Sequence, residues 1–148
     1  MTKKQIIKEL IDCFKRGNKV LIAGNGGSAS MSQHWAAEFV CKFEKERRAL
    51  PAISLTTNGS ILTAWSNDCN FNRVFSRQVE ALGNKGDILI GISTSGRSLN
   101  VKYALKTAKL KEMVCIDLPR LGVGTARIQE FQLRLMHNIT REVEKEFI

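Results

Sequence analysis

The chain has 148 residues, a length that suits one packed core and leaves little room for a second catalytic domain. We therefore expect a single domain over residues 1–148. Hydrophobic residues make up 43% of the sequence and charged residues 25%, which is typical of a globular protein and argues against a disordered chain. No apolar run is long enough to span a bilayer, and the amphipathic first segment does not resemble an export signal, so we expect a cytoplasmic protein without membrane contacts.

The net charge of +9 is compatible with nucleic-acid binding, but the basic residues are dispersed and no nucleic-acid-binding module is recognisable. We therefore expect no nucleic-acid partner, and solvated basic faces that also attract a small anionic substrate. The four cysteines form no CxxC pair, so the sequence predicts reduced, mostly buried thiols rather than disulfides or a thiolate metal site. These residues are Cys13, Cys41, Cys69 and Cys115.

The first predicted element is a helix that ends near Gly17. Apolar residues recur at helical spacing from Ile6 to Phe14. Thr2 and Gln5 have the spacing of a capping box, and a glycine is a common helix stop.

The rest of the chain alternates strands with helices. Short apolar runs predict strands at 19–23, 52–55, 87–92 and 113–118. Helical patterns are found at 31–43, 61–65, 71–82 and 101–108, and from 125 to the end. This alternation predicts an α/β fold, a doubly wound parallel sheet flanked by helices.

Two polar loops follow the first and third predicted strands, GNGGS at 24–28 and STSGRS at 93–98. Ligands of such sheets bind outside the carboxyl ends of the strands. Backbone N–H groups at a helix start, clustered hydroxyls and the glycine Gly96 all favour a bound phosphate. Because no GxxxxGK[ST] pattern is present, we expect a phosphorylated metabolite rather than a nucleotide.

Each loop also has a simpler interpretation. Ser95 or Ser98 could merely cap the following helix, although capping uses one hydroxyl and this loop offers four. The GNGG run could be a turn that needs positive φ angles. Its spacing does not match a dinucleotide-binding GxGxxG fingerprint.

The two histidines of the chain each lie near a possible partner. His34 and Glu38 share one helix face, which suits metal binding or proton transfer but is also the spacing of ordinary surface pairs. Glu38 lies roughly 15 Å of helical rise beyond Ser28, a distance that points to a neighbouring subunit. Gln129 and His137 lie roughly 12 Å apart along one helix, so long side chains, a bend or two subunits would be needed to reach one ion.

The ordered motifs from about residue 19 to residue 143 resemble the phosphoheptose isomerases, which are sugar-isomerase (SIS) domain proteins. The motifs are AGNGGSAS, His34 with Glu38, SND at 66–68, ISTSGRS, and TARIQE with His137. The resemblance implies a flavodoxin-like SIS fold. It also implies conversion of D-sedoheptulose 7-phosphate to D-glycero-D-manno-heptose 7-phosphate, an early step towards heptose for bacterial lipopolysaccharide or capsule. A homotetramer with active sites at subunit interfaces is implied as well.

The resemblance further implies residue roles. Glu38 would be the base and His137 the acid of an aldose–ketose isomerisation through an enediol. The residues implied in substrate binding are Asn25, Gly26, Gly27, Ser28, Asn67, Asp68, Ser93, Thr94, Ser95, Ser98 and Gln129. Zn²⁺ is a plausible cofactor, held by His34, Glu38, Gln129 and His137.

Two other functions fit the same fold. One is a non-catalytic SIS-domain protein that binds a replication-initiator partner, and the other is a sugar-phosphate-sensing module. Relatives of the first kind typically lack the residues that match Glu38 and His137, and this chain has both. The isomerase is therefore the preferred interpretation.

The segment Pro119 to Gly124 departs from the family pattern. Family members usually carry a further helix and an edge strand here, and six residues cannot hold such a crossover. We therefore expect a shortened C-terminal half. Either the last helix packs differently, or another subunit covers the strand edge that this shortening exposes.

Overall fold

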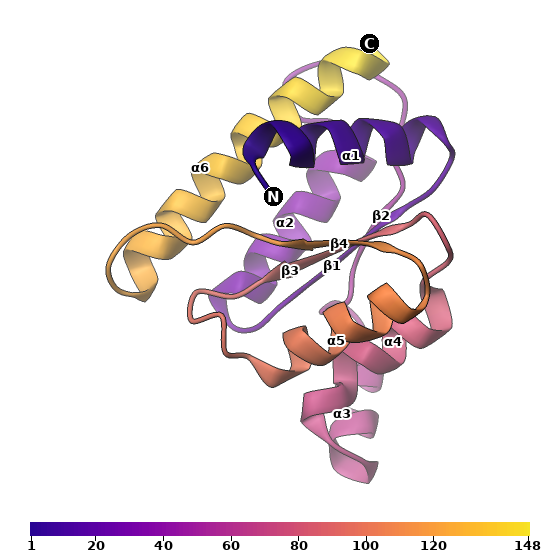
Figure 1. Cartoon of the computed structure of the whole chain (residues 1–148), viewed down its shortest axis with the longest axis vertical. Coiled ribbons are helices and arrows are strands. Elements are labelled where there is room, and N and C mark those ends of the chain that lie inside the picture. Colours follow the sequence, from indigo (N-terminus) through magenta and orange to yellow (C-terminus); the bar gives the residue numbers. More distant parts are fainter.

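Four short apolar segments form one parallel sheet at the centre of the computed structural model, which describes all residues from 1 to 148 (Figure 1). The strands are β1 (Val20–Gly24), β2 (Ala52–Ser54), β3 (Ile88–Ile92) and β4 (Val114–Asp117). Their order across the sheet is β2-β1-β3-β4, and every neighbouring pair is parallel. This is the order of flavodoxin-like doubly wound sheets, as the sequence predicts.

Six α-helices and two 3₁₀ turns complete the fold. The helices are α1 (Lys3–Lys15), α2 (Gly27–Val40), α3 (Gly59–Asp68), α4 (Val74–Leu82), α5 (Leu99–Leu110) and α6 (Thr125–Glu144). The 3₁₀ turns are η1 (Phe71–Arg73) and η2 (Lys145–Phe147). The predicted helix at 71–82 is thus divided into η1 and α4.

The start of α2 lies four residues earlier than its apolar pattern predicts. Gly26 has a φ of 56° and ends the loop, so the helix begins at once with Gly27. Glycine and serine are weak helix formers, which hid this first turn in the sequence. The helix also ends at Val40 rather than at residue 43.

The predicted capping box at the start of α1 is confirmed. The backbone N–H of Thr2 donates to Gln5 Oε1 at 2.7 Å, and the backbone N–H of Gln5 donates to Thr2 Oγ1 at 3.3 Å. Gly17, just beyond the helix, has a φ of 77°, a conformation that glycine adopts without strain.

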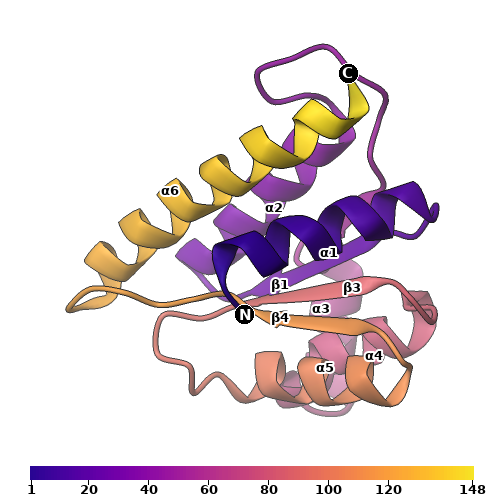
Figure 2. The ribbon, with the colours of Figure 1, turned by 45° about the horizontal axis from the view of Figure 1, so that its top comes forward.

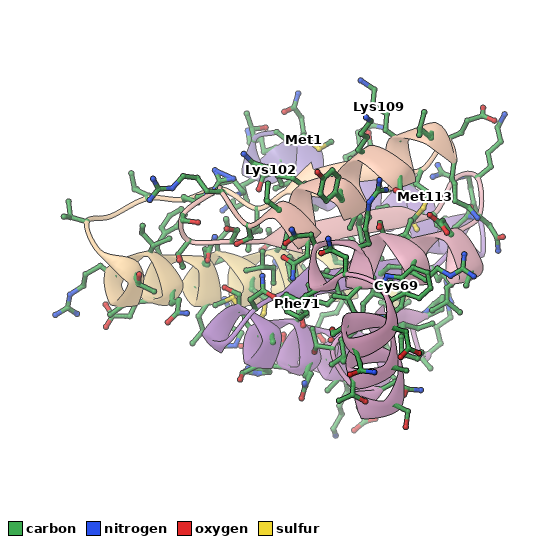
Figure 3. The ribbon with its side chains drawn as sticks, turned by 90° about the horizontal axis from the view of Figure 1, so that it is seen from below. Met1, Cys69, Phe71, Lys102, Lys109 and Met113 are labelled. Carbon is green, nitrogen blue, oxygen red and sulfur yellow. The ribbon has the colours of Figure 1, made fainter.

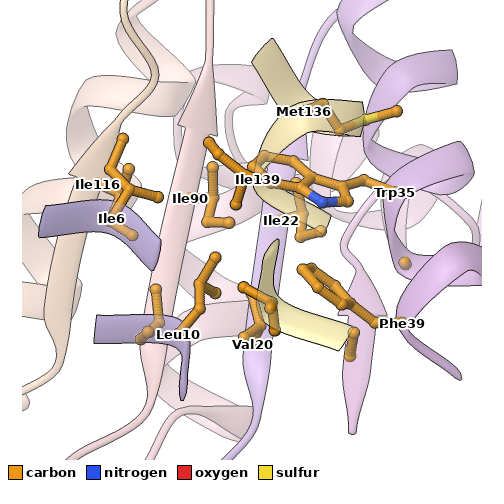
Figure 4. Packing of buried hydrophobic residues seen from close by; sticks show 14 of the residues in the cluster. Ile6, Leu10, Val20, Ile22, Trp35, Phe39, Ile90, Ile116, Met136 and Ile139 are labelled. Carbon is orange, nitrogen blue, oxygen red and sulfur yellow. The ribbon is translucent and has the colours of Figure 1, made fainter. Parts of the chain in front are cut away.

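Helices cover both faces of the sheet, with α1, α2 and α6 on one side and α3, α4 and α5 on the other (Figures 1 and 2). Alternate residues of β1, β3 and β4 pack into the two cores. Ile22 packs towards α1, α2 and α6 (Figure 4), whereas Leu21 packs towards α4 and α5. On α5 the side chains of Val101, Ala104 and Ala108 are buried, whereas Lys102 and Lys109 are exposed on the outer side of the helix (Figure 3).

The connection from β4 to α6 is as short as the sequence indicates, and no strand lies between them. As a result β4 pairs with β3 alone and forms one edge of the sheet. Helix α6 returns directly across the sheet face and packs against α1 and α2 (Figure 2).

Two expectations from composition can be compared with the structure. All four cysteines are free, but Cys41 and Cys69 are exposed, so the expectation of mostly buried thiols is wrong. Both lie just after the last residue of a helix, where the chain turns at the surface. No helix combines the length and the apolar character that crossing a membrane requires.

A buried carboxylate ties the amino-terminal ends of β1 and β3 together. Asp87 is 1% exposed and accepts hydrogen bonds from the backbone N–H groups of Lys19 and Asn84 and from the Asn18 amide. The Lys19 ammonium lies 2.5 Å from the same carboxylate. Burial alone would raise the pKa of Asp87, but these hydrogen bonds outweigh it and hold the pKa below its ordinary value of 3.8.

We predict that Asp87→Asn lowers the free energy of unfolding by about 2–4 kcal/mol at neutral pH, because Lys19 and the backbone donors lose a charged acceptor. Since folding lowers this pKa, the carboxylate's contribution is present above the ordinary pKa of 3.8 and is lost as the pH falls below it. Urea unfolding at pH 7 and pH 3 checks this, and the gap between wild type and variant should narrow at pH 3.

The matched control is Asp12→Asn, which removes an exposed carboxylate paired with Lys8. This substitution should leave the free energy of unfolding almost unchanged, because exposed ion pairs contribute little. Equal effects of the two substitutions would contradict the role given to Asp87.

Candidate functional site

The two predicted ligand loops lie side by side at the carboxyl ends of β1 and β3. These strands are neighbours, but the helices that follow them, α2 and α5, cover opposite faces of the sheet. The two loops therefore lead to opposite faces of the sheet. Doubly wound sheets bind their ligands at such switch points. Asn25 and Asn100 join the loops through two reciprocal amide hydrogen bonds of 2.8 Å each.

A cavity of about 290 Å³ lies between these loops and the start of α6. It is lined by Asn25, Gly26, Gly27, Ser28, Ile92, Ser93, Thr94, Ser98, Thr125 and Gln129. Most of the predicted substrate-binding residues are thus brought together in one chain. A Cβ atom on Gly27 would lie 2.4 Å from Gln129 Nε2, so the glycine allows α6 to approach this closely.

The loop at 93–98, called the serine loop below, has hydroxyls that line this cavity and do not all cap the following helix. Ser98 occupies the N-cap position of α5, but its side chain makes no capping hydrogen bond. Its Oγ instead lies 3.1 Å from Ser93 Oγ, which also accepts the Gly96 N–H at 3.0 Å. Ser95 is exposed, accepts the Arg97 N–H and does not line the cavity. The simple capping interpretation therefore does not explain the loop.

The second part of the site is a cluster of three side chains between α2 and α6. Glu38 Oε1 lies 2.9 Å from His34 Nε2 and 3.2 Å from His137 Nε2. Glu38 is 7% exposed. Burial raises the pKa of its carboxyl above the ordinary 4.5, while the imidazoles of His137 and His34 oppose that rise.

This cluster has the donors and the compactness that a metal ion needs. One donor atom from each of His34, Glu38 and His137 lies within 4.8 Å of the others. Two imidazoles and a carboxylate are a known set of protein ligands for catalytic zinc, with a fourth position left open. The residues present therefore fit a divalent metal.

An aromatic ring covers the outer side of His137. Phe43 stacks on the imidazole with ring centroids 5.3 Å apart and an interplanar angle of 27°. The guanidinium of Arg141 lies over the Phe43 ring, 5.6 Å from its centroid. Arg141 Nε also donates a hydrogen bond to the Glu44 carboxylate at 2.9 Å. The segment after α2 thus helps to fix the imidazole on α6.

A further cavity of about 430 Å³ lies between α2 and α6. Its lining includes Gly27 and Gln129, which it shares with the loop cavity, and His34 from the cluster. Glu38 and His137 do not line this cavity, but α6 lies alongside α2 and places His137 against Glu38 within one chain. A neighbouring subunit is not needed to bring His137 to Glu38.

Gln129 and His137 lie at different places along the contact between α2 and α6. Gln129 lies against Gly27, whereas His137 lies against Glu38, about two turns further along α6. The side chains thus follow the separation that the helix imposes. Coordination of a metal by Gln129 stays a prediction.

Asn67 and Asp68 are not brought to this site. Both are exposed at the end of α3, where the Asn67 amide donates to Asp68 Oδ1 at 2.8 Å. Helix α3 packs against α4 and η1, and neither residue lines the loop cavity or the α2–α6 cavity.

Two side chains that contact the site were missed in the sequence. Arg120 Nε donates to the Ser93 carbonyl at 2.9 Å, and its guanidinium pairs with Asp117 and lies over Gly96. Nothing in its local pattern distinguishes this arginine. Thr140 contacts Glu38, and its spacing of three residues from His137 could have placed it on the same helix face.

Comparison with known proteins agrees with this arrangement. The SIS domain family matches residues 4–118. Phosphoheptose isomerase 1 of Campylobacter jejuni is 48% identical, with 93% of this chain and 83% of that protein aligned. The alignment covers 154 positions, more than the 148 residues of this chain, so the relative has residues without a counterpart here.

Solved structures give the same result. A phosphoheptose isomerase from Francisella tularensis superimposes with a TM-score of 0.92 at 33% identity, covering 97% of this chain and 85% of that one. The phosphoheptose isomerase from Neisseria gonorrhoeae gives a TM-score of 0.87 at 37% identity, with the same coverage. The chain therefore belongs to the SIS domain family and, within it, to the phosphoheptose isomerases.

Proposed function

We propose that this chain converts D-sedoheptulose 7-phosphate to D-glycero-D-manno-heptose 7-phosphate for the heptose of bacterial surface glycans. The observation that carries the proposal is the cluster of His34, Glu38 and His137 in a member of the phosphoheptose isomerases. His34 of this cluster lines a cavity that shares Gly27 and Gln129 with the hydroxyl-lined loop cavity. Catalysis of this isomerisation needs a phosphate anchor, a base and an acid, and this chain has a candidate for each.

The loops after β1 and β3 would hold the phosphate. Backbone N–H groups at the start of α5 and the hydroxyls of Ser93, Thr94 and Ser98 are suitable donors to phosphate oxygens. The cavity between α2 and α6 would then receive the carbon chain of the sugar and place its carbonyl end near His34, which contacts Glu38. Holding both ends of the substrate aligns the reacting carbon with the base.

Glu38 would take a proton from C1 of the ketose while His137 gives one to the oxygen on C2, which produces an enediol. Return of a proton to C2 and loss of the proton on the C1 oxygen then gives the aldose, with no net oxidation or reduction. Burial raises the pKa of Glu38, and a carboxylate with a raised pKa is a stronger base.

We also propose Zn²⁺ as the ion that His34, Glu38 and His137 hold. Their donor types and mutual distances support this choice. When bound, zinc would polarise the sugar carbonyl. Gln129 is retained as a further candidate ligand.

The homotetramer implied by the family resemblance is retained as a proposal, together with a cytoplasmic location. In such a tetramer Asn67 and Asp68 would contact the substrate bound to a neighbouring subunit, because within one chain they lie apart from both cavities. The neighbouring subunit could also cover the unpaired edge of β4.

A purely binding role is less well supported. A partner-binding or sugar-sensing module needs the serine loop at most, and it has no use for a buried carboxylate between two imidazoles. Burying such a group has a cost in stability, which a catalytic role explains.

We predict that Glu38→Gln lowers kcat by about 10²–10⁴-fold, because the amide cannot accept the proton from carbon. The assay uses sedoheptulose 7-phosphate and couples the product to a heptose kinase. Glu142→Gln, an exposed change on α6, is the matched control and should keep wild-type turnover. Full activity of Glu38→Gln would refute the base, and an inactive wild type would refute the isomerase.

We predict that the purified chain holds about one zinc ion, and that His34→Ala lowers both the zinc content and kcat. Elemental analysis and turnover before and after chelation provide the measurement, and added zinc should restore the rate. Gln129→Ala in the same experiment tests whether that residue is a ligand. Cys69→Ser is the control for adventitious binding to an exposed thiol. Unchanged zinc content in His34→Ala would contradict the site.

A further inference from the structure

We propose that Thr140, fixed by Trp35, is a positioning residue that orients the catalytic carboxylate of Glu38. The inference rests on the proposed function, because it concerns the base of that reaction. Thr140 lies on α6 three residues after His137, so both side chains face α2. The acid and the orienting hydroxyl thus come from one helix face.

The two oxygens of Glu38 have different partners. Oε1 faces the imidazoles of His34 and His137 at 2.9 and 3.2 Å. Oε2 lies 3.3 Å from Thr140 Oγ1. The terminal torsion of a glutamate side chain is normally broad, so a partner on each oxygen is what restricts rotation of the carboxylate. Without Thr140, only the two imidazoles at Oε1 would restrict rotation of the Glu38 carboxylate.

Trp35 determines how the threonine hydroxyl can be used. Its indole Nε1–H donates to Thr140 Oγ1 at 2.9 Å, and an indole N–H can only donate. The single hydroxyl proton of Thr140 therefore goes to one of two acceptors, Glu38 Oε2 or the Met136 carbonyl at 2.9 Å. An ionised carboxylate is the stronger acceptor of the two, which favours donation to Glu38.

The surroundings make these hydrogen bonds hard to replace. Trp35 and Thr140 are both 0% exposed, so water has no access to fill a missing partner. Trp35 is held among Met136 and Ile139 of α6 and stacks on Phe39 with centroids 5.8 Å apart (Figure 4). The hydrogen bond from Trp35 is thus anchored in the core that joins α2 to α6.

Thr140 and Trp35 act on the base without lining either substrate cavity. Loss of the hydroxyl should therefore slow the chemical step and leave substrate binding almost unchanged. Small displacements of a catalytic group are known to have large effects on rate.

The test compares Thr140→Val, which keeps the shape of the side chain, with Thr140→Ser, which keeps the hydroxyl. We expect kcat to fall about 10–100-fold in the valine variant with KM within about twofold, and serine to restore kcat to within about threefold of wild type. Trp35→Phe should lower kcat less than the valine variant. Thr107→Val, on the distant helix α5, is the matched control and should not change kcat.

Wild-type kcat in Thr140→Val, or equal losses in the serine and valine variants, would overturn the proposal. A lowered melting temperature with unchanged kcat per folded molecule would also overturn it, since that is the result of a structural role alone. A second measurement does not depend on turnover. The infrared carboxylate band of Glu38, identified by its loss in Glu38→Gln, should shift in Thr140→Val and not in Thr140→Ser.

An unshifted band in Thr140→Val overturns the proposal even if the substrate is another sugar phosphate. Conversely, an inactive wild type with a shifted band would refute the proposed reaction and leave the positioning role intact. The two failures are therefore distinguishable.

Discussion

The contact between α2 and α6 is the constraint on which the rest of the site depends. Glu38 lies at its centre, with an imidazole from each helix on one oxygen. The apolar side of the same contact, around Trp35, belongs to the core that also covers the sheet. The packing that stabilises the fold therefore also sets the geometry of the proposed acid and base.

Much of the fold could be predicted from the sequence because short apolar runs alternate regularly with helical patterns. The four strands and the capping box at Thr2 are local features, and they were found close to their observed bounds. The start of α2 was missed because its first turn consists of weak helix formers whose position depends on the conformation of Gly26. Exposure of Cys41 and Cys69 could not be predicted, since cysteine is usually buried.

The parts of the site that could be predicted are those whose polar residues are close together in the sequence. The serine loop and the GNGGS loop follow adjacent strands, so strand order alone brings them together. The approach of His137 to Glu38 depends on how α6 crosses the sheet, which no local pattern encodes. For the same reason the sequence pointed to a second subunit, whereas α6 of the same chain places His137 against Glu38. Arg120 was missed because its partners are a backbone carbonyl and a glycine.

The direct passage from β4 into α6 has a consequence for the order in which the protein matures. All four strands and both loops lie before residue 119 in the chain, whereas Gln129 and His137 lie after it. During synthesis the four strands and the two loops therefore leave the ribosome before the last helix does. Docking of α6 then adds Leu135, Met136 and Ile139 to the core and brings His137 to Glu38, so one late event completes both the core and the candidate site.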